Sequence, residues 1–255
     1  MLEAIILGIV QGVTEFLPIS STAHLILFPW FFNWNGVLDT LTFNIALHTG
    51  TLIALIIFFR RDWIDLIFKK HTLFGLIVLA SVPGGLAGFF LNDFVENNLR
   101  DPLIISLMLV SVGFLMLISE KSNKHRDVES TGLKDALIIG IAQAFAIIPG
   151  VSRSGITISA GLFRGLEREA AARFSFLLST PIIAGATLLH FKEALDYSIN
   201  YDFKLFLMGI VTSFITGYFA IKFLLSFLKR YPLNIFVYYR FILSAVILAG
   251  LWLKE

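Results

Sequence analysis

The sequence predicts an all-α polytopic membrane protein with six transmembrane helices and two re-entrant helix hairpins, arranged as an inverted-topology repeat. Of its 255 residues, 57% are hydrophobic and only 15% are charged, and the mean hydropathy is +0.83. Soluble domains usually carry about 25% charged residues. Several apolar runs are long enough to span a bilayer, and two others are broken by polar turns. The same order of segments occurs twice along the chain. The whole chain, 1–255, is therefore expected to form one membrane domain.

Composition also excludes several classes of function. The net charge of +2 is too small to suggest a nucleic-acid partner. The chain has no cysteine, which excludes disulfides and thiolate metal sites. Membrane lipids are expected as partners.

The first repeat, 1–119, begins with an apolar stretch at 4–32 that is broken at Pro18. Each half is about 13 residues or fewer, too short for a bilayer core that needs about 20. This predicts a re-entrant hairpin, and Gly8 and Gly12 would let a neighbouring helix approach its first arm closely. Three full spans are expected to follow: Thr42–Phe59, Leu73–Leu91 and Pro102–Ser119. A polar linker, 120–134, then separates the two repeats.

The second repeat, 135–255, has the same order, with a broken apolar stretch at 136–163 and three further spans. Those spans are Phe174–Phe191, Leu205–Leu228 and Asn234–Leu253. Gly8-Ile9-x-Gln11 aligns with Gly140-Ile141-x-Gln143, and Phe43-x-x-x-Leu47-His48-Thr49 aligns with Phe174-x-x-x-Leu178-Ser179-Thr180, at an offset of 131–132 residues. Chance likeness between apolar segments is the alternative, but the offset also holds through polar positions. An odd number of crossings per copy inverts the second copy, as in membrane proteins whose broken helices meet near the midplane.

The orientation follows from Lys and Arg near the span ends. Thirteen of them lie in loop 60–72, in the linker and its edge, in loop 164–173 and at 229–230, against four on the other side. The basic loops are therefore expected to be cytoplasmic, and both termini to face outward.

Basic residues and histidines inside apolar sequence have a less specific interpretation. Lys222 and Arg240 are expected near the inner ends of their spans, where long side chains extend to the membrane surface. His48 and His190 are expected to be packing or interfacial residues. Arg153 differs because it lies at the turn of a hairpin.

The first turn brings together acid–base groups. Gln11 and Glu15 are four residues apart and share a helix face. Pro18 ends this helix, and His24 lies one turn into the next, facing the same way as its first hydroxyls. An intramembrane carboxylate such as Glu15 is costly and is a functional candidate by default. Three hydroxyls stand where the second helix begins and can cap it: Ser20, Ser21 and Thr22.

The second turn resembles an anion site. Pro149 and Gly150 break the chain, and Ser152 is a natural N-cap for the helix that follows. Arg153 and Ser154 add a guanidinium and a hydroxyl to the free N–H groups of that helix. Such an arrangement binds phosphate. If the repeat holds, the two turns meet near the middle of the bilayer.

Two functions fit this combination. In the first, a phosphate ester or anhydride is hydrolysed at the membrane: Ser21 or His24 attacks phosphorus, Glu15 positions or activates the nucleophile or holds a divalent cation, and Arg153 stabilises the phosphoryl oxygens. In the second, the repeats transport or flip an anionic lipid. The nucleophile, imidazole and carboxylate beside the anion site favour the enzyme. A scaffold without chemistry would leave Glu15 and Arg153 unexplained.

The two stretches are also similar to known signature motifs. Residues 11–24 read Gln-Gly-Val-Thr-Glu-Phe-Leu-Pro-Ile-Ser-Ser-Thr-Ala-His, and residues 149–157 read Pro-Gly-Val-Ser-Arg-Ser-Gly-Ile-Thr. Both closely resemble the motifs of the bacitracin-resistance-type undecaprenyl-diphosphate phosphatases, and the likeness extends over essentially the whole chain. The motifs are long and highly specific.

The resemblance implies a multi-pass enzyme of the bacterial cytoplasmic membrane whose site opens to the periplasmic or outer side. It would convert undecaprenyl diphosphate to the monophosphate carrier for peptidoglycan and other envelope polymers, giving bacitracin resistance. The family uses a divalent cation, usually Mg²⁺ or Ca²⁺. The resemblance also allows a homodimer, since dimers are known in the family.

By motif position, the resemblance makes Glu15, His24 and Arg153 the catalytic core, with Ser21 or His24 as nucleophile and Glu15 as the metal ligand. The residues expected to bind the diphosphate are Gln11, Ser20, Thr22, Ser152, Ser154 and Thr157. Many members have a second glutamate where this chain has Gln11, and an amide adds no charge to a metal site. The cation is therefore expected to be held largely by substrate phosphates and water.

Overall fold

A computed structural model describes all residues except 33, 35–37, 39, 197–202 and 255. The described residues form helices and contain no strand, so the predicted all-α class is confirmed. The helices are α1 (Leu2–Phe16), α2 (Ser21–Phe32), α3 (Leu41–Phe58), α4 (Arg60–Phe68), α5 (His71–Asn98), α6 (Pro102–Ser119), α7 (Leu133–Ala144), α8 (Arg153–Phe163), α9 (Arg168–Asp196), α10 (Phe203–Leu228) and α11 (Asn234–Lys254), with short 3-10 turns η2 (Val128–Ser130) and η3 (Phe145–Ile147).

Five helices in the described part of the chain are long and apolar enough to cross a membrane: α5, α6, α9, α10 and α11. A sixth candidate is α3 joined to α4, with a bend of 65° between them. The predicted span Pro102–Ser119 matches α6, which Asp101 caps by accepting a hydrogen bond from the Leu103 N–H at 2.7 Å.

The expectation of a plain loop at 60–72 is wrong, because α4 occupies most of it. Charge alone suggested a loop, but Leu66 is buried and Trp63 packs against the core. The apolar side chains of this basic segment thus hold it as a helix against the protein. Helix α9 likewise begins at Arg168, earlier than the predicted span.

Two pairs of helices are too short to cross the membrane singly. Helices α1 and α2 have 15 and 12 residues, and α7 and α8 have 12 and 11. At about 1.5 Å per residue, none reaches the roughly 30 Å of a hydrocarbon core. Helices α1 and α2 are joined by a short turn at 17–20, and α7 and α8 by the 3-10 turn η3 followed by residues 148–152.

Small residues let these short helices pack closely against long ones. Helix α1 packs along α10, and a Cβ added at Gly8 or Gly12 would lie 1.9 Å from the hydroxyl of Thr212 or Thr216. Helix α7 packs along α5, where a Cβ at Gly140 would lie 2.5 Å from a backbone carbonyl oxygen. The predicted close approach at Gly8 and Gly12 is confirmed.

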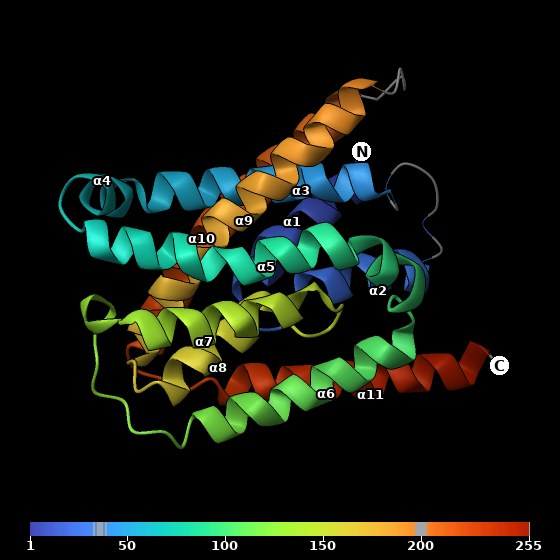
Figure 1. Ribbon diagram of the computed structural model, residues 1–255. Coiled ribbons are helices and arrows are strands. Elements are labelled where there is room, and N and C mark those ends of the chain that lie inside the picture. The colour runs from blue at the N-terminus through green and yellow to red at the C-terminus, as the bar shows by residue number, and fades with distance from the viewer. Residues whose placement is uncertain (33, 35–37, 39, 197–202, 255) are drawn as a thin grey trace.

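The basic segments gather at one end of the molecule. Figure 1 shows α4 and the linker at the left, while α11 ends at the right. Ion pairs join these segments: Lys70 with Glu129 at 2.7 Å, Arg168 with Glu120 at 2.7 Å, Lys229 with Glu169 at 3.3 Å, and Arg173 with Asp62. The charge count thus separated the two ends of the bundle correctly.

Two interpretations of single residues change. Arg240 does not extend to the surface, since its side chain is fully buried between helices. His48, expected to be a packing or interfacial residue, lies beside the Glu15 carboxylate. Lys222 is exposed, as expected. The side chain of His190 lies outside the described residues.

Candidate active site

The two turns meet in the interior of the bundle. The Ser154 hydroxyl of the second turn donates a hydrogen bond to the Leu17 carbonyl of the first at 3.1 Å. The Arg153 guanidinium reaches across to Glu15, with 3.0 Å between Nη2 and Oε1. Residues more than 130 positions apart thus form one site.

Both turns end in the same backbone conformation. Ser20 has φ 75° and Ser152 has φ 71°, and they are the only described non-glycine residues with positive φ. Each caps the next helix: Ser20 Oγ accepts from the Ala23 N–H at 3.4 Å, and Ser152 Oγ accepts from the Gly155 N–H at 3.2 Å. Positive φ is strained for a side chain and is found where surrounding contacts enforce it. The predicted N-cap at Ser152 is confirmed.

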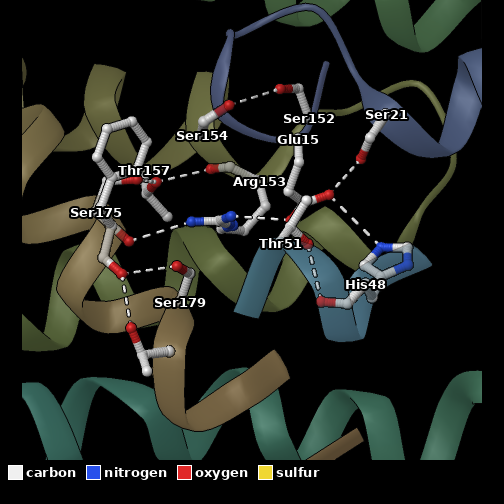
Figure 2. Close-up of polar contacts among 12 residues, drawn as sticks. Glu15, Ser21, His48, Thr51, Ser152, Arg153, Ser154, Thr157, Ser175 and Ser179 are labelled. Carbon is white, nitrogen blue, oxygen red and sulfur yellow. Dashed lines mark hydrogen bonds and ion pairs between the residues drawn. The ribbon is translucent and has the colours of Figure 1, made fainter. Parts of the chain in front are cut away.

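Glu15 is the centre of the polar network (Figure 2). Its Oε2 accepts a hydrogen bond from the Ser21 hydroxyl at 2.6 Å and from the Gln11 amide at 3.1 Å, and His48 Nε2 lies 3.5 Å away. Its Oε1 faces Arg153. The carboxylate is 7% exposed, so a charge in this dry position is stabilised by hydrogen bonds and by its ion pair. Ser21 and Glu15 thereby form a hydroxyl–carboxylate pair.

Arg153 is held from behind by helices α8 and α9. Its Nη1 donates to the Ser175 carbonyl at 3.2 Å, while the Thr157 hydroxyl donates to the Arg153 carbonyl at 2.7 Å. The hydroxyls of Thr157 and Ser175 lie 2.6 Å apart. These bonds aim the guanidinium at Glu15 and leave it 13% exposed. The Ser175 carbonyl therefore holds the guanidinium, while Thr157 links the Arg153 backbone to the Ser175 hydroxyl.

A cavity of about 300 Å³ opens beside this network. Six of the predicted residues line it: Glu15, Ser20, Ser21, Thr22, Ser152 and Arg153. Four lie outside its lining: Gln11, His24, Ser154 and Thr157. Each of these four instead bonds a residue of the two turns or their helices: Gln11 bonds the Glu15 carboxylate, and His24, Ser154 and Thr157 bond the backbone carbonyls of Ser20, Leu17 and Arg153.

The expected convergence of His24 with the Ser21 hydroxyl is wrong. Its Nδ1 bonds the Ser20 carbonyl at 2.7 Å and its Nε2 bonds the Tyr239 hydroxyl at 2.7 Å. Since α2 begins at Ser21, a residue one turn on lies on a similar face, but the ring turns back toward the cap and α11. Both ring nitrogens are engaged away from the cavity.

The cavity has members that the residue-by-residue argument missed. His48 and Ser179 lie on α3 and α9, and both line it. They occupy equivalent places in the alignment of the two halves, so the repeat carried a signal for them. Gln143 also lines the cavity and is equivalent to Gln11, which binds Glu15.

A smaller cavity of about 140 Å³ continues from the main one and shares Thr22, His48 and Asn92 with it. It extends to Glu96 and Arg100, beside the C-terminal end of α5. Helix α5 begins at the basic end of the molecule, so its C-terminal end lies on the opposite side. The smaller cavity therefore extends toward the end of the bundle opposite the basic segments.

The donor set does not fit a divalent ion held by the protein alone. The described residues contain no cluster of three or more His, Asp or Glu that could surround one. Glu15 is the sole carboxylate lining the main cavity, and its oxygens already face Ser21, Gln11 and Arg153. Mg²⁺ and Ca²⁺ need several oxygen ligands and a site free of adjacent cations. A cation at this position would depend on oxygens that the substrate brings.

Comparison with known proteins identifies the family. Residues 4–246 match the family described as "Bacitracin resistance protein BacA". The chain belongs to the BacA family. It is 54% identical to a protein named undecaprenyl-diphosphatase from Thermodesulfovibrio yellowstonii, over 97% of this chain and 96% of that protein. A protein of the same name from Moorella thermoacetica is 48% identical, over 100% of this chain and 99% of its own length. One from Desulforudis audaxviator is 44% identical, over 96% of each chain.

The resemblance inferred from the two turn motifs is thereby confirmed. In this BacA-family chain the motifs coincide with the turns. Residues 11–24 contain the end of α1, the first turn and the start of α2, and residues 149–157 contain the second turn and the start of α8. The structure adds that the two motifs touch. The likeness extends through the spans as well, so the bundle that positions the turns is shared with these relatives.

Proposed function

We propose that this chain hydrolyses undecaprenyl diphosphate to undecaprenyl phosphate and inorganic phosphate. The observation that supports it most directly is the contact of the Ser21 hydroxyl with Glu15, opposite Arg153, on a cavity of about 300 Å³. The name undecaprenyl-diphosphatase of the relatives supports the substrate. The product would return to envelope polymer synthesis, and its supply would give bacitracin resistance.

In the first step, Ser21 Oγ attacks the terminal phosphorus and its proton passes to Glu15, which already accepts that hydrogen bond at 2.6 Å. The bond from phosphorus to the bridging oxygen breaks, and that oxygen leaves with the lipid monophosphate. Arg153 offers paired N–H donors to the phosphoryl oxygens as their charge develops. Ser21 is chosen over His24 because it lines the cavity and His24 does not.

In the second step, water attacks the phosphoserine, the serine oxygen leaves, and inorganic phosphate is released. Glu15 mediates the proton transfers, so that the nucleophile returns to its resting state. The helix N-terminus capped by Ser152 supplies further N–H donors beside Arg153. The two turns thus divide nucleophile activation from phosphate binding.

The topology we propose has six spans and two re-entrant hairpins in two inverted halves. The starts of α6 and α11 are 132 residues apart, as are those of α5 and α10 and those of α2 and α8. The protein would lie in the cytoplasmic membrane with its basic segments inside, by the positive-inside rule. The cavity would then open outward. A homodimer is compatible with this arrangement.

A divalent cation, Mg²⁺ or Ca²⁺, would arrive with the diphosphate oxygens, since the protein offers one carboxylate. Its contribution would be to neutralise phosphate charge. Removing it with a chelator should stop turnover without lowering the melting temperature in detergent. A large fall in melting temperature would indicate a structural metal instead.

The deciding experiment measures phosphate release from undecaprenyl diphosphate by the purified protein, with and without chelator. Release that depends on Arg153 and Glu15 would support the proposal. Movement of the intact lipid between leaflets of a liposome, without release, would favour the transporter that uses the same inverted halves.

A further inference from the structure

Arg240 of α11 is the largest fully buried side chain in the described part of the molecule. It pairs with no carboxylate among the described residues, and its donors point to backbone carbonyls. Nε bonds the carbonyl of Leu109 at 3.0 Å, Nη1 bonds that of Pro18 at 3.3 Å, and Nη2 bonds those of Met108, Gly150 and Val151 at 3.2, 2.8 and 3.2 Å.

These contacts join the parts that build the site. Pro18 belongs to the first turn, Gly150 and Val151 belong to the second, and the other two carbonyls belong to α6. Within the described chain, no other donor bonds the carbonyls of Pro18, Gly150 or Val151. A buried carbonyl left without a hydrogen-bond donor is destabilising. One guanidinium, with five donors, thus satisfies both turns at once.

Burial of a cation is expensive, and an apolar side chain of similar size would fill this space without that cost. The presence of a charged guanidinium here is therefore explained by the backbone carbonyls that it bonds. Pro18 lies midway between Glu15 and Ser21, and Val151 directly precedes Ser152. Each turn also contains one serine with positive φ, a conformation that persists only where neighbours enforce it.

We infer that Arg240 is a positioning residue that fixes the two turns relative to each other, keeping the Ser21–Glu15 pair opposite Arg153. It acts through the backbone, because it is not among the residues lining the cavity. Its contacts also follow the repeat: the Pro18 and Gly150 carbonyls are 132 residues apart, and Arg240 bonds Leu109, 131 residues before it. The arginine lies where the two halves meet.

The test compares Arg240→Lys with Ser244→Ala. Lysine keeps the charge but places three donors on one nitrogen, which cannot reach both turns as the fork does. Ser244 bonds Ser106 at 2.7 Å between the same two helices, one turn further along α11, and touches neither turn. It therefore controls for loss of α6–α11 packing. Each variant is purified, its monodisperse fraction is assayed for phosphate release, and its backbone exchange is measured by mass spectrometry.

In Arg240→Lys we expect kcat to fall at least about tenfold with KM within about threefold, since small misplacements of reacting groups cost about 10²-fold. Peptides covering 17–22 and 149–155 should exchange faster. Ser244→Ala should keep kcat within about twofold and leave both peptides unchanged. If lysine yields no monodisperse protein, the neutral donor in Arg240→Gln is measured in the same way.

Two results would overturn the inference: a folded variant at position 240 with unchanged kcat, or a loss of kcat without faster exchange at either turn. The turnover arm rests on the proposed function, whereas the exchange arm does not. If the unsubstituted protein released no phosphate, the proposed function would fail and exchange alone would decide the role of Arg240.

Discussion

The two turns of this protein end in the same backbone conformation but present different chemistry. In both, a serine with positive φ caps a short helix, at Ser20 and at Ser152. Directly after that cap the first turn has Ser21 and the second has Arg153. One turn therefore presents a hydroxyl to Glu15, and the other presents a cation to the same carboxylate. Two turns that end in the same capped conformation can thus contribute different groups to one site, because the residue after the cap differs.

The helices behind the turns differ in how they are anchored. Helix α7 begins at a fixed point, because Asp135 accepts the Gly132 N–H at 2.9 Å and pairs with Arg126 and Arg164, each at 2.7 Å. Helix α1 has no side-chain cap hydrogen bond at its start. It is held instead by close packing on α10 at Gly8 and Gly12. The helix pair that carries Arg153 is anchored by ion pairs, whereas the pair that carries Ser21 is anchored by packing.

Removing the serine hydroxyl from each turn should show the largest difference in turnover between the two turns. Ser21→Ala should reduce turnover by about 10⁴-fold or more, because loss of a nucleophile disables the whole catalytic unit. The matched change Ser152→Ala, which removes a cap, should cost about 1 kcal/mol of stability and far less turnover. Initial rates of phosphate release and melting temperatures measure both.

The identity of the nucleophile is tested by trapping. An acid-stable phosphoenzyme lost in Ser21→Ala would support serine. An acid-labile one lost in His24→Gln would contradict the proposed role of Ser21, and the absence of any phosphoenzyme would indicate direct attack by water.

The arginine of the second turn should be nearly as important. Arg153→Ala should lower turnover by about 10³–10⁵-fold, the range for an arginine that stabilises a transferring phosphoryl group. Arg153→Lys should also be poor, since a point charge cannot form the paired bonds of a guanidinium. Phosphate release from protein that remains folded in detergent is the measurement. Near-normal turnover in the alanine variant would refute the assignment.

The carboxylate that joins the two turns comes next. Glu15→Gln should reduce turnover by about 10²–10⁴-fold, because the amide still bonds Ser21 but cannot accept its proton. Gln11→Ala removes a neighbour that bonds Glu15 at 3.1 Å yet does not line the cavity, and should cost about tenfold or less. If the two variants were equally mild, Glu15 would have only a packing role.

The smallest effect concerns the anchor of α7 and its response to pH. Burial raises the pKa of Asp135, but hydrogen bonds from Arg126, the Gly132 N–H and Arg164 outweigh it and lower the pKa to about 2. A lowered folded-state pKa means that the contribution of Asp135 is complete above its ordinary pKa of about 4 and is lost as pH falls toward 2. Asp135→Asn should therefore lower the melting temperature at pH 6. At pH 3 the difference in melting temperature between the variant and the unsubstituted protein should be smaller. A constant difference across that range would contradict this.

Much of the architecture was predictable because it follows from local rules. Hydropathy located the spans, with Pro102–Ser119 matching α6, since a bilayer core requires long apolar helices. Turn chemistry located both hairpin turns, and charge separated the two ends of the bundle. Helix α4 was missed because its basic residues concealed the apolar side chains that hold it to the core.

The sequence predicted which residues form the site better than it predicted where their side chains point. Glu15, Ser21 and Arg153 meet as expected, but His24 turns to Tyr239, and His48 takes a place beside Glu15 that no local pattern indicated. Spacing along a helix gives a face, whereas the direction of a ring depends on which partner from another helix reaches it. That partner lies 215 residues away for His24.

The sequence by itself determined the membrane class, the two polar turns and the residue types that each turn presents, because hydropathy, helix breaking and capping act over a few residues. Only the tertiary structure decided that Ser21 and Arg153 face one carboxylate, and that Arg240 is buried between the turns. A cation near a span end ordinarily reaches the surface, and only the assembled bundle offers it carbonyls from both halves. The role of a charged residue in the membrane is set by the partners that packing brings to it.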